Sequence, residues 1–293
     1  GFINKINNYR NKIVGKSRIL DIEQINLFSK YNFKKVVMGD FSDINIDILK
    51  EGINVDLIRI AFHKKDFKKA LETCNLIKKL GYKVSVNAMA ISNYSINELE
   101  YLFEYVNKYN LDILYIVDSY GSLTQKDIKN NFDLFNSKLN KECIIGFHLH
   151  NNMNNAYGNY EFLKNYTNGC KREIIVDTTL FGMGRGAGNL QTELVLKDSI
   201  SIDYIYNIVN FIQNFIKPIY KVNDNSWGYD LDYLLSGYLK MHPNYIVKMR
   251  EFNISMNNRF FLIEKMIEKK IEYNYFDVKI INSLVEEFKN VLL

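Results

Sequence analysis

The sequence predicts an α/β fold in which a parallel sheet forms a TIM (β/α)8-type barrel, followed by a helical C-terminal region. Three observations predict it. Continuous apolar segments alternate with amphipathic helical segments, which is the pattern of parallel strands covered by helices. Six such apolar segments recur at regular spacing between residues 35 and 176. Polar side chains stand at or just past their C-terminal ends, where TIM barrels carry their active sites.

The expected strands are short, apolar along their length and separated by helical segments. They cover residues 35–39, 56–63, 83–89, 113–117, 143–147 and 173–176. The polar residues at their ends are His63, Asn87, Asp118, His148, His150 and Asp177. An open Rossmann-type sheet would gather its signature at one crevice, and no glycine-rich dinucleotide turn follows the first strand. A barrel is therefore favoured over a doubly wound sheet.

The helices between the strands are marked by capping residues as well as by apolar periodicity. Gly81 is expected to end one of them, and Ser95 with Glu98 forms a capping box that opens the next. Thr124 and Asp127 open the helix after the fourth strand. The expected helices cover residues 19–28, 44–51, 66–80, 95–107 and 156–164, with one more beginning at residue 124.

After residue 197 the regular alternation stops and the remaining apolar segments have helical spacing. Helices are expected over residues 204–216, 231–239, 261–269 and 276–291, with Pro218 and Pro243 as breaks. The chain is therefore expected to contain a barrel over residues 1–197 and a helical region over residues 198–293. That region would serve packing, oligomerisation or partner binding.

Composition argues against several classes of protein. The 293 residues carry a net charge of +5, but the lysines are scattered and form no basic strip with interleaved aromatic residues, which speaks against nucleic-acid binding. Cys74, Cys143 and Cys170 form no Cys-x-x-Cys pair, so a reduced cytoplasmic protein is the simplest interpretation. No membrane span or signal peptide is visible. The chain begins with Gly1 rather than methionine, which predicts that further sequence precedes it.

The residues with the clearest chemical meaning form the run GFHLHNN at residues 146–152, at the end of the fifth strand. Side chains alternate faces along a strand, so His148 and His150 point the same way with backbone positions roughly 7 Å apart. That geometry suits a shared metal ion. Two histidines that end a strand without any ligand remain the alternative.

Three segments together resemble a known superfamily. FHLHNN at residues 147–152 resembles the His-x-His-Asn strand of the DRE-TIM metallolyases, which include 4-hydroxy-2-oxovalerate aldolase, hydroxymethylglutaryl-CoA lyase and 2-isopropylmalate synthase. VDSYG at residues 117–121 resembles their Asp-x-x-Gly turn, and DTTLFGMGRGAGN at residues 177–189, with Glu193 beyond it, resembles their glycine signature. The order of the three, over residues 1–197, is that of the family, and the aldolase branch is the most similar. A fainter similarity to that branch covers residues 227–245.

One family motif is absent. The superfamily is named after an Asp-x-x-Leu-Arg-Asp-Gly run on the first barrel strand, which supplies a metal-binding aspartate and a catalytic arginine. This chain has no such run, and its opening residues, GFIN, look like those that follow it. The chain is therefore expected to lack the first barrel strand, as a fragment of a longer protein or as a protein that has lost it.

The resemblance implies a divalent-metal site. His148 and His150 would supply two imidazoles and Asn189 a weaker ligand, with Mn²⁺ or Mg²⁺ as the ion. The carboxylate that completes the set belongs to the absent run. Asn189 has a second interpretation, as the N-cap of a helix that starts at Leu190.

Other residues are candidates for catalysis and substrate binding. Asp118 and Arg185 are the candidate catalytic residues, although Asp118 has a second interpretation as a turn residue before Gly121. Asp177 is expected to orient His150 or the glycine loop, or to cap the turn after its strand. Candidate substrate contacts are strand-end and loop residues, namely His63, Ser119, Gly184 and Gly186. His63 can equally be a solvated loop residue, and His242 is interpreted as structural.

The resulting hypothesis is an enzyme, a metal-dependent aldolase or lyase that makes or breaks a carbon–carbon bond of a 2-oxo acid through a metal-bound enolate. An acyl-CoA-dependent synthase on the same barrel and a non-catalytic scaffold remain alternatives. No lysine stands at an inward-facing strand end for Schiff-base chemistry, and no third histidine or cysteine near the pair suggests a zinc hydrolase. The C-terminal helices would mediate a homodimer or binding of a partner enzyme.

Overall fold

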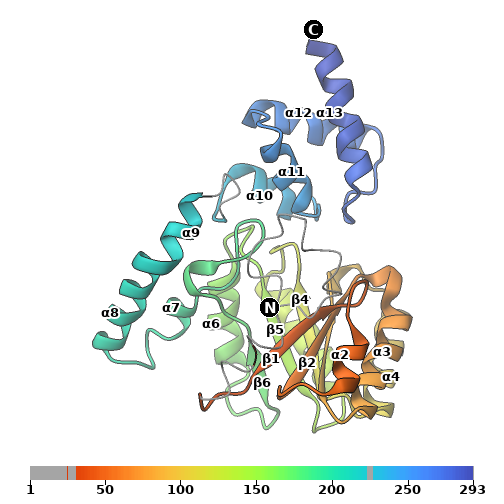
Figure 1. The fold of residues 1–293 in the computed structure, drawn as a ribbon, viewed down its shortest axis with the longest axis vertical. Helices are drawn as coiled ribbons and strands as arrows, with labels where there is room; N and C mark the ends of the chain where they lie inside the picture. The colour runs from red at the N-terminus through yellow and green to blue at the C-terminus, as the bar shows by residue number, and fades with distance from the viewer. Residues whose placement is uncertain (1–24, 26–30, 223–226, 293) are drawn as a thin grey trace. The chain divides into compact units, whose positions relative to one another are not determined.

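The computed structural model of the chain describes residues 25, 31–222 and 227–292 (Figure 1). The helix predicted over residues 19–28 lies outside the described residues except for Ile25. The chain divides into two compact units. The first contains Gly1–Val117, Asn130–Phe147 and Gly169–Ile175, and the second contains Asp118–Lys129, His148–Asn168 and Val176–Leu293. The predicted boundary at residue 197 stays a prediction.

Six strands form one parallel sheet in the order of the sequence, β1-β2-β3-β4-β5-β6. Their bounds are β1 Val36–Asp40, β2 Leu57–Phe62, β3 Lys83–Ala88, β4 Ile113–Asp118, β5 Ile144–Leu149 and β6 Ile174–Val176. Each agrees with a predicted strand to within two residues. Together with the helices described next, they confirm the predicted α/β class.

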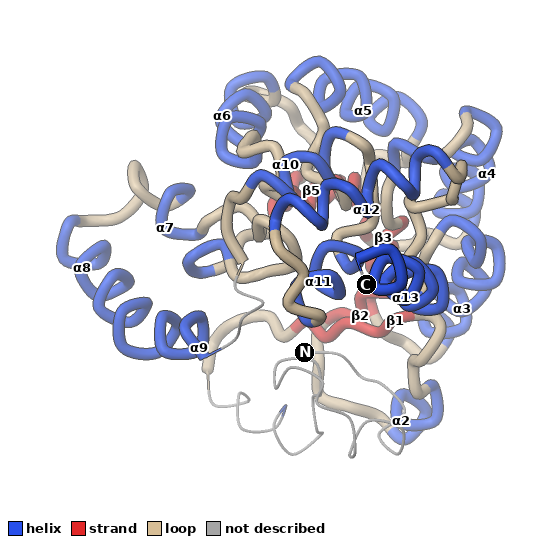
Figure 2. Tube along the Cα trace, turned by 90° about the horizontal axis from the view of Figure 1, so that it is seen from above, coloured by secondary structure: helices blue, strands red, loops and turns tan. Residues whose placement is uncertain are grey.

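The first unit contains most of the sheet, with helices along its outer side (Figure 2). A buried apolar cluster of Leu57, Ile113, Tyr115 and Val117 lies on its strands. Tyr115 fits because Gly146 on β5 has no side chain, and a Cβ at Gly146 would lie 2.5 Å from the Tyr115 ring. Burial of these side chains explains why the strands are rich in apolar residues.

The helices that alternate with the strands begin and end close to the predicted capping residues. Ser95 and Glu98 form the predicted capping box, and Thr124 bonds reciprocally with Asp127 in the first turn of the helix that begins at Gln125. Gly81 follows α3 with a φ of 95°, a conformation that favours glycine. The bounds are α2 Ile46–Glu51, α3 Phe67–Lys79, α4 Ile96–Lys108, α5 Gln125–Lys138 and α6 Ala156–Tyr166.

The helical segment over residues 202–222 corrects one expectation. Pro218 does not end the helix, because α8 (Ile202–Phe211) continues through a π-helical turn at Ile212–Ile216 into α9 (Lys217–Val222). Proline lacks the N–H that an α-helix needs, and the wider π turn directly before it changes the bonding pattern at that point. Pro243 interrupts the helices as expected and stands at the N-cap of the helix that begins at Asn244.

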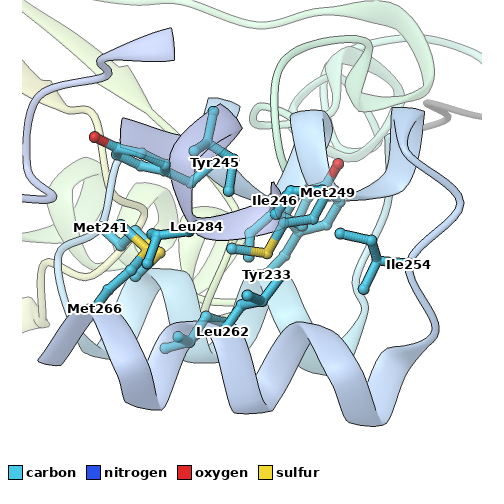
Figure 3. Packing of buried hydrophobic residues seen from close by; sticks show 13 residues of the cluster. Tyr233, Met241, Tyr245, Ile246, Met249, Ile254, Leu262, Met266 and Leu284 are labelled. Atoms are coloured by element: carbon cyan, nitrogen blue, oxygen red, sulfur yellow. The ribbon is translucent and has the colours of Figure 1, made fainter. Parts of the chain in front are cut away.

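The C-terminal helices of the second unit are α10 Leu231–Tyr238, α11 Asn244–Glu251, α12 Met256–Glu268 and α13 Val278–Leu292. The helix α11 was not predicted, and α12 begins five residues before the predicted helix. Apolar side chains from all four helices form one core, in which Tyr233, Tyr245, Met249 and Leu262 are almost fully buried (Figure 3). No helix in the described part of the chain is long and apolar enough to cross a bilayer.

Candidate metal centre

The two histidines of the predicted pair lie at the end of β5, both in the second unit. His148 is the fifth residue of the strand and His150 follows its last residue. Their rings meet edge to face, with centroids 5.0 Å apart and an interplanar angle of 75°. The alternation of side chains along a strand therefore brings both imidazoles to the same side, as predicted from their spacing.

A carboxylate holds the first histidine in place. Nδ1 of His148 lies 2.8 Å from Oδ2 of Asp177, which directly follows β6. Both side chains are about one-fifth exposed. Asp177 had been expected to orient His150 or the glycine loop, and the structure pairs it with His148 instead. A carboxylate that accepts a bond from Nδ1–H leaves Nε2 of the same ring with a free lone pair.

Asn189 is brought to the second histidine by main-chain pairing. Residues His150 and Asn189 form an antiparallel bridge, and the Asn189 N–H donates to the carbonyl oxygen of Gly182 at 2.9 Å. The side-chain Nδ2 of Asn189 donates to the carbonyl oxygen of Met183 at 3.0 Å, which fixes the orientation of the amide. The alternative interpretation of Asn189 as an N-cap is wrong, because the next helix, α7 (Thr192–Val195), has Gln191 at that position.

The glycine loop has the compact shape that its glycines permit. Gly182, Gly186 and Gly188 have φ values of 62°, 64° and 89°, a region that side chains with a Cβ rarely adopt. A Cβ at Gly188 would lie 2.2 Å from the carbonyl oxygen of Gly182. The loop is also tied to the strand-end run, because the fully buried Asn152 accepts a bond from the Ala187 N–H at 2.9 Å. Asn152 was given no role from the sequence, although two adjacent asparagines after a strand end are a signal for such a bond.

The side chain of Asp118 accepts hydrogen bonds from the main chain of the turn that follows β4. Its Oδ1 accepts a bond from the Ser122 N–H at 3.0 Å, and its Oδ2 accepts one from the Leu123 N–H at 3.2 Å. Burial raises the pKa of this carboxyl from its ordinary value of 3.8 to about 7, although these N–H donors favour the charged form. The turn lies against the histidine run, since a Cβ at Gly121 would meet the main chain of His150 and Asn152. The hydrogen bonds of the Asp118 side chain therefore support its interpretation as a turn residue.

The remaining predicted residues have different positions. Ser119 lies in the same turn as Asp118, and Arg185 is exposed in the glycine loop between Gly184 and Gly186. Gly184 packs against the amide of Asn189, because a Cβ there would lie 2.4 Å from Nδ2 of that residue. His63, which follows β2, belongs to the first unit. His242 is mostly buried and its Nδ1 accepts a bond from the Asn244 N–H at 3.2 Å, in agreement with its structural interpretation.

Three side chains present donor atoms that suit a divalent cation. Nδ1 of His150 and Oδ1 of Asn189 are buried and have no hydrogen-bond partner among the described residues. Burial lowers the pKa of His150 well below its ordinary value, and the neighbouring His148 adds to this, so the ring is neutral at pH 7 and keeps a lone pair. Imidazole and amide donors are ligands for ions such as Mn²⁺. Among the described residues, no group of three or more His, Cys, Asp and Glu side chains could hold a metal ion, so these donors form an incomplete set.

Comparison with known proteins agrees with the motifs. Residues 57–200, which include β2 to β6, match the sequence profile of the HMGL-like family. These residues belong to the HMGL-like family. The match confirms the resemblance to the DRE-TIM metallolyases, because it covers the histidine pair, the Asp118 turn and the glycine loop.

Individual relatives of the HMGL-like region share part of the sequence. A 4-hydroxy-2-oxovalerate aldolase from Bacillus thuringiensis (strain Al Hakam) is 26% identical over 181 residues, which are 59% of this chain and 51% of that protein. The corresponding Geobacillus stearothermophilus protein is 24% identical over 220 residues, 73% of this chain and 61% of that protein. The matched part of the chain thus spans about half to three-fifths of the length of these relatives.

Solved structures share the fold. The N-terminal domain of a proposed aldolase from Bacteroides vulgatus matches with a TM-score of 0.67 and 25% identity, over 81% of this chain and 79% of that one. The carboxyl transferase domain of Rhizobium etli pyruvate carboxylase matches with a TM-score of 0.62 and 11% identity, over 83% of this chain and 44% of that one. At that identity the second likeness concerns the fold alone.

Proposed function

We propose that this chain belongs to a divalent-metal-dependent aldolase that cleaves or forms a carbon–carbon bond of a 4-hydroxy-2-oxo acid. The observation that carries the proposal is the convergence of His148, His150 and Asn189, with two buried donor atoms that have no partner among the described residues. The HMGL-like match and the relatives named 4-hydroxy-2-oxovalerate aldolase support the reaction class.

Three residues of the chain would hold the ion, and a fourth prepares one of them. Asp177 fixes His148 in the tautomer that carries its proton on Nδ1. Burial keeps His150 neutral, and the bond to the Met183 carbonyl turns the Asn189 amide so that its oxygen is the unpaired atom. A divalent cation bound there would supply Lewis-acid stabilisation of the negative charge that develops on the substrate when the carbon–carbon bond breaks.

The tip of the glycine loop is the proposed contact for the substrate carboxylate. The N–H groups of Gly182, Met183, Ala187 and Gly188 are bonded within the protein. Arg185 is exposed between Gly184 and Gly186, and its guanidinium is proposed as the catalytic group that meets the substrate carboxylate. Gly184 and Gly186 are proposed as the neighbouring substrate-binding residues. Ser119, beside Asp118, is a further candidate.

The test is pyruvate release from 4-hydroxy-2-oxo acids, followed by NADH consumption in a lactate dehydrogenase assay. The protein should include any sequence that precedes this chain naturally, because a complete ligand set needs a carboxylate. We expect activity that depends on added Mn²⁺ or Mg²⁺ and that is lost in the double variant His148→Ala, His150→Ala. Activity without metal, or unchanged activity in the double variant, would refute the proposal.

The carboxylate beside His148 gives a finer test. Asp177→Asn keeps the shape of the side chain but replaces the charged acceptor, so we expect Mn²⁺ affinity to fall about 10- to 100-fold. Asp198→Asn is the matched control, because Asp198 is more than half exposed and its ion pair with Lys164 is long, at 3.8 Å. Titration calorimetry measures the Mn²⁺ affinity of both variants. Thiol release that requires acetyl-CoA would instead indicate a synthase, and a protein without metal binding would indicate a scaffold.

A further inference from the structure

Phe181, the residue before the glycine loop, has a backbone conformation that phenylalanine rarely adopts. Its φ of 56° and ψ of 25° lie in the left-handed region. The Cβ of an ordinary residue crowds its own main chain there, so such a conformation persists only where surrounding contacts hold it. The neighbouring loop positions with positive φ, such as Gly182 and Gly188, are glycines, so the phenylalanine at position 181 calls for a specific explanation.

Two side chains from other parts of the chain bind both polar groups of the Phe181 main chain. The Phe181 N–H donates to Oε2 of Glu193 at 3.1 Å, and the Phe181 carbonyl oxygen accepts a bond from Nε1–H of Trp227 at 2.6 Å. The Phe181 ring packs edge to face on Tyr220 and on Trp227, with centroid distances of 5.5 and 6.3 Å. These contacts together form a clamp around one strained residue.

The clamp is connected directly to Asn189. Gly182, next to Phe181, accepts the main-chain bond from Asn189 at 2.9 Å, and a Cβ on Gly182 would lie 3.0 Å from the Asn189 carbonyl oxygen. Trp227 also packs on the far end of the loop, since a Cβ on Gly188 would lie 3.2 Å from its Cδ1. A change in the Phe181 conformation would rotate the Gly182 carbonyl away and release the main chain of Asn189.

We propose that Glu193 and Trp227 are positioning residues, which hold Phe181 in its left-handed conformation and thereby direct the Asn189 side chain toward the metal site. This inference rests on the proposed function, because it assumes that Asn189 is a ligand. Neither side chain touches the ion. Their effect passes through the main chain of residues 181 and 182.

The test is Mn²⁺ affinity, measured by the electron paramagnetic resonance signal of free Mn²⁺, in four variants. Glu193→Ala should weaken binding about tenfold, which is the lower end of the effect of outer-shell partners. Glu193→Gln keeps an oxygen acceptor for the Phe181 N–H and should stay within about twofold of the wild type. Trp227→Phe keeps an aromatic ring but loses the N–H donor, and should weaken binding about two- to tenfold. Glu264→Ala, at an exposed position of α12, is the control and should have no effect.

A rescue experiment separates positioning from a general loss of structure. Glycine adopts positive φ freely, so Phe181→Gly removes the strain that the clamp opposes. The double variant Phe181→Gly, Glu193→Ala should therefore bind Mn²⁺ more tightly than Glu193→Ala alone. Trp227 is the only tryptophan of the chain, so its fluorescence reports whether the clamp region stays folded in every variant that retains it.

The outcomes distinguish this inference from the proposed function. A wild-type protein that binds Mn²⁺, together with Glu193→Ala and Trp227→Phe variants of unchanged affinity, overturns the clamp and leaves the aldolase proposal standing. A wild-type protein that binds no Mn²⁺ overturns both. If Glu193→Ala fails to fold, Trp227→Phe decides alone, and unchanged affinity in that variant is again the refuting result.

Discussion

Replacing Asp118 by asparagine is expected to change how the stability of the protein depends on pH. The Asp118 carboxyl is 4% exposed, and its pKa in the folded protein is raised from 3.8 to about 7, chiefly by burial. In the unfolded chain the group titrates near its ordinary value. Between about pH 4 and pH 7 the folded protein therefore holds a proton at Asp118 that the unfolded chain has lost.

The sign and size of the effect follow from this difference. Where the folded state binds more protons, the free energy of unfolding falls as the pH rises. A difference of about three pKa units corresponds to about 4 kcal/mol, lost progressively between pH 4 and pH 7. Above pH 7 both states are ionised and no further change comes from Asp118. Asparagine does not titrate, so the Asp118→Asn variant lacks this slope.

Urea unfolding at half-unit pH intervals from 4 to 8 measures the free energy of unfolding of wild type and variant. The advantage of the wild type over Asp118→Asn should shrink steadily toward pH 7 and then level off. Subtraction removes the other carboxyls, including Glu98, whose pKa is lowered to about 2 by bonds to Lys64 and Ser95. Asp47→Asn, at a side chain that is 81% exposed, is the control for the substitution itself. A flat or rising curve for Asp118→Asn would falsify the assigned cause.

Two further predictions concern stability. Asp232 is completely buried between Arg250 and Arg259, with shortest N–O distances of 2.6 and 2.9 Å. Asp232→Ala removes the buried carboxylate that Arg250 and Arg259 share and leaves Arg250 with Asp230 alone, so it should cost about 3–5 kcal/mol in urea unfolding. A loss below about 1 kcal/mol, typical of an exposed pair, would contradict it. Gly188→Ala should destabilise clearly more than Gly169→Ala, because both have positive φ but only Gly188 has an atom within 4 Å of the added Cβ. Thermal melting compares the two variants, and an equal fall in their melting temperatures would refute the steric explanation.

The strands and most helix ends were predictable because each depends on residues that are close in sequence. The capping box at Ser95 and Glu98 closes within four residues, and the apolar strands need only a buried sheet to form. The continuation of the helix through Pro218 was not predictable in this way. A π turn can accommodate proline, but nothing in the local sequence distinguishes that outcome from a break. The helix α11 was missed because Pro243 was interpreted only as a break, whereas the structure has it at the N-cap of this helix.

The histidine pair of the candidate site was predictable for the same reason, since a period of two along β5 places both rings on one side. The partners of the pair were harder to predict. Asp177 was recognised at its strand end, but the sequence did not decide which histidine it would meet. The interpretation of Asn189 as an N-cap failed because capping rules consider only the following helix, whereas this residue is held by a main-chain bond to Gly182 and stands opposite His150 in an antiparallel bridge.

The two kinds of donor are therefore placed by different physical means. His148 and His150 follow from the regular geometry of a strand, and disturbing them disturbs β5 itself. Asn189 is placed by a loop whose path requires left-handed conformations at Phe181, Gly182 and Gly188. The loop is also part of the packed structure, because residues 186–190 are buried and Ala187 belongs to the core cluster of the C-terminal helices. Substitutions that add a Cβ within the loop, such as Gly188→Ala, should therefore weaken metal binding and the fold together, as should substitutions in the body of β5.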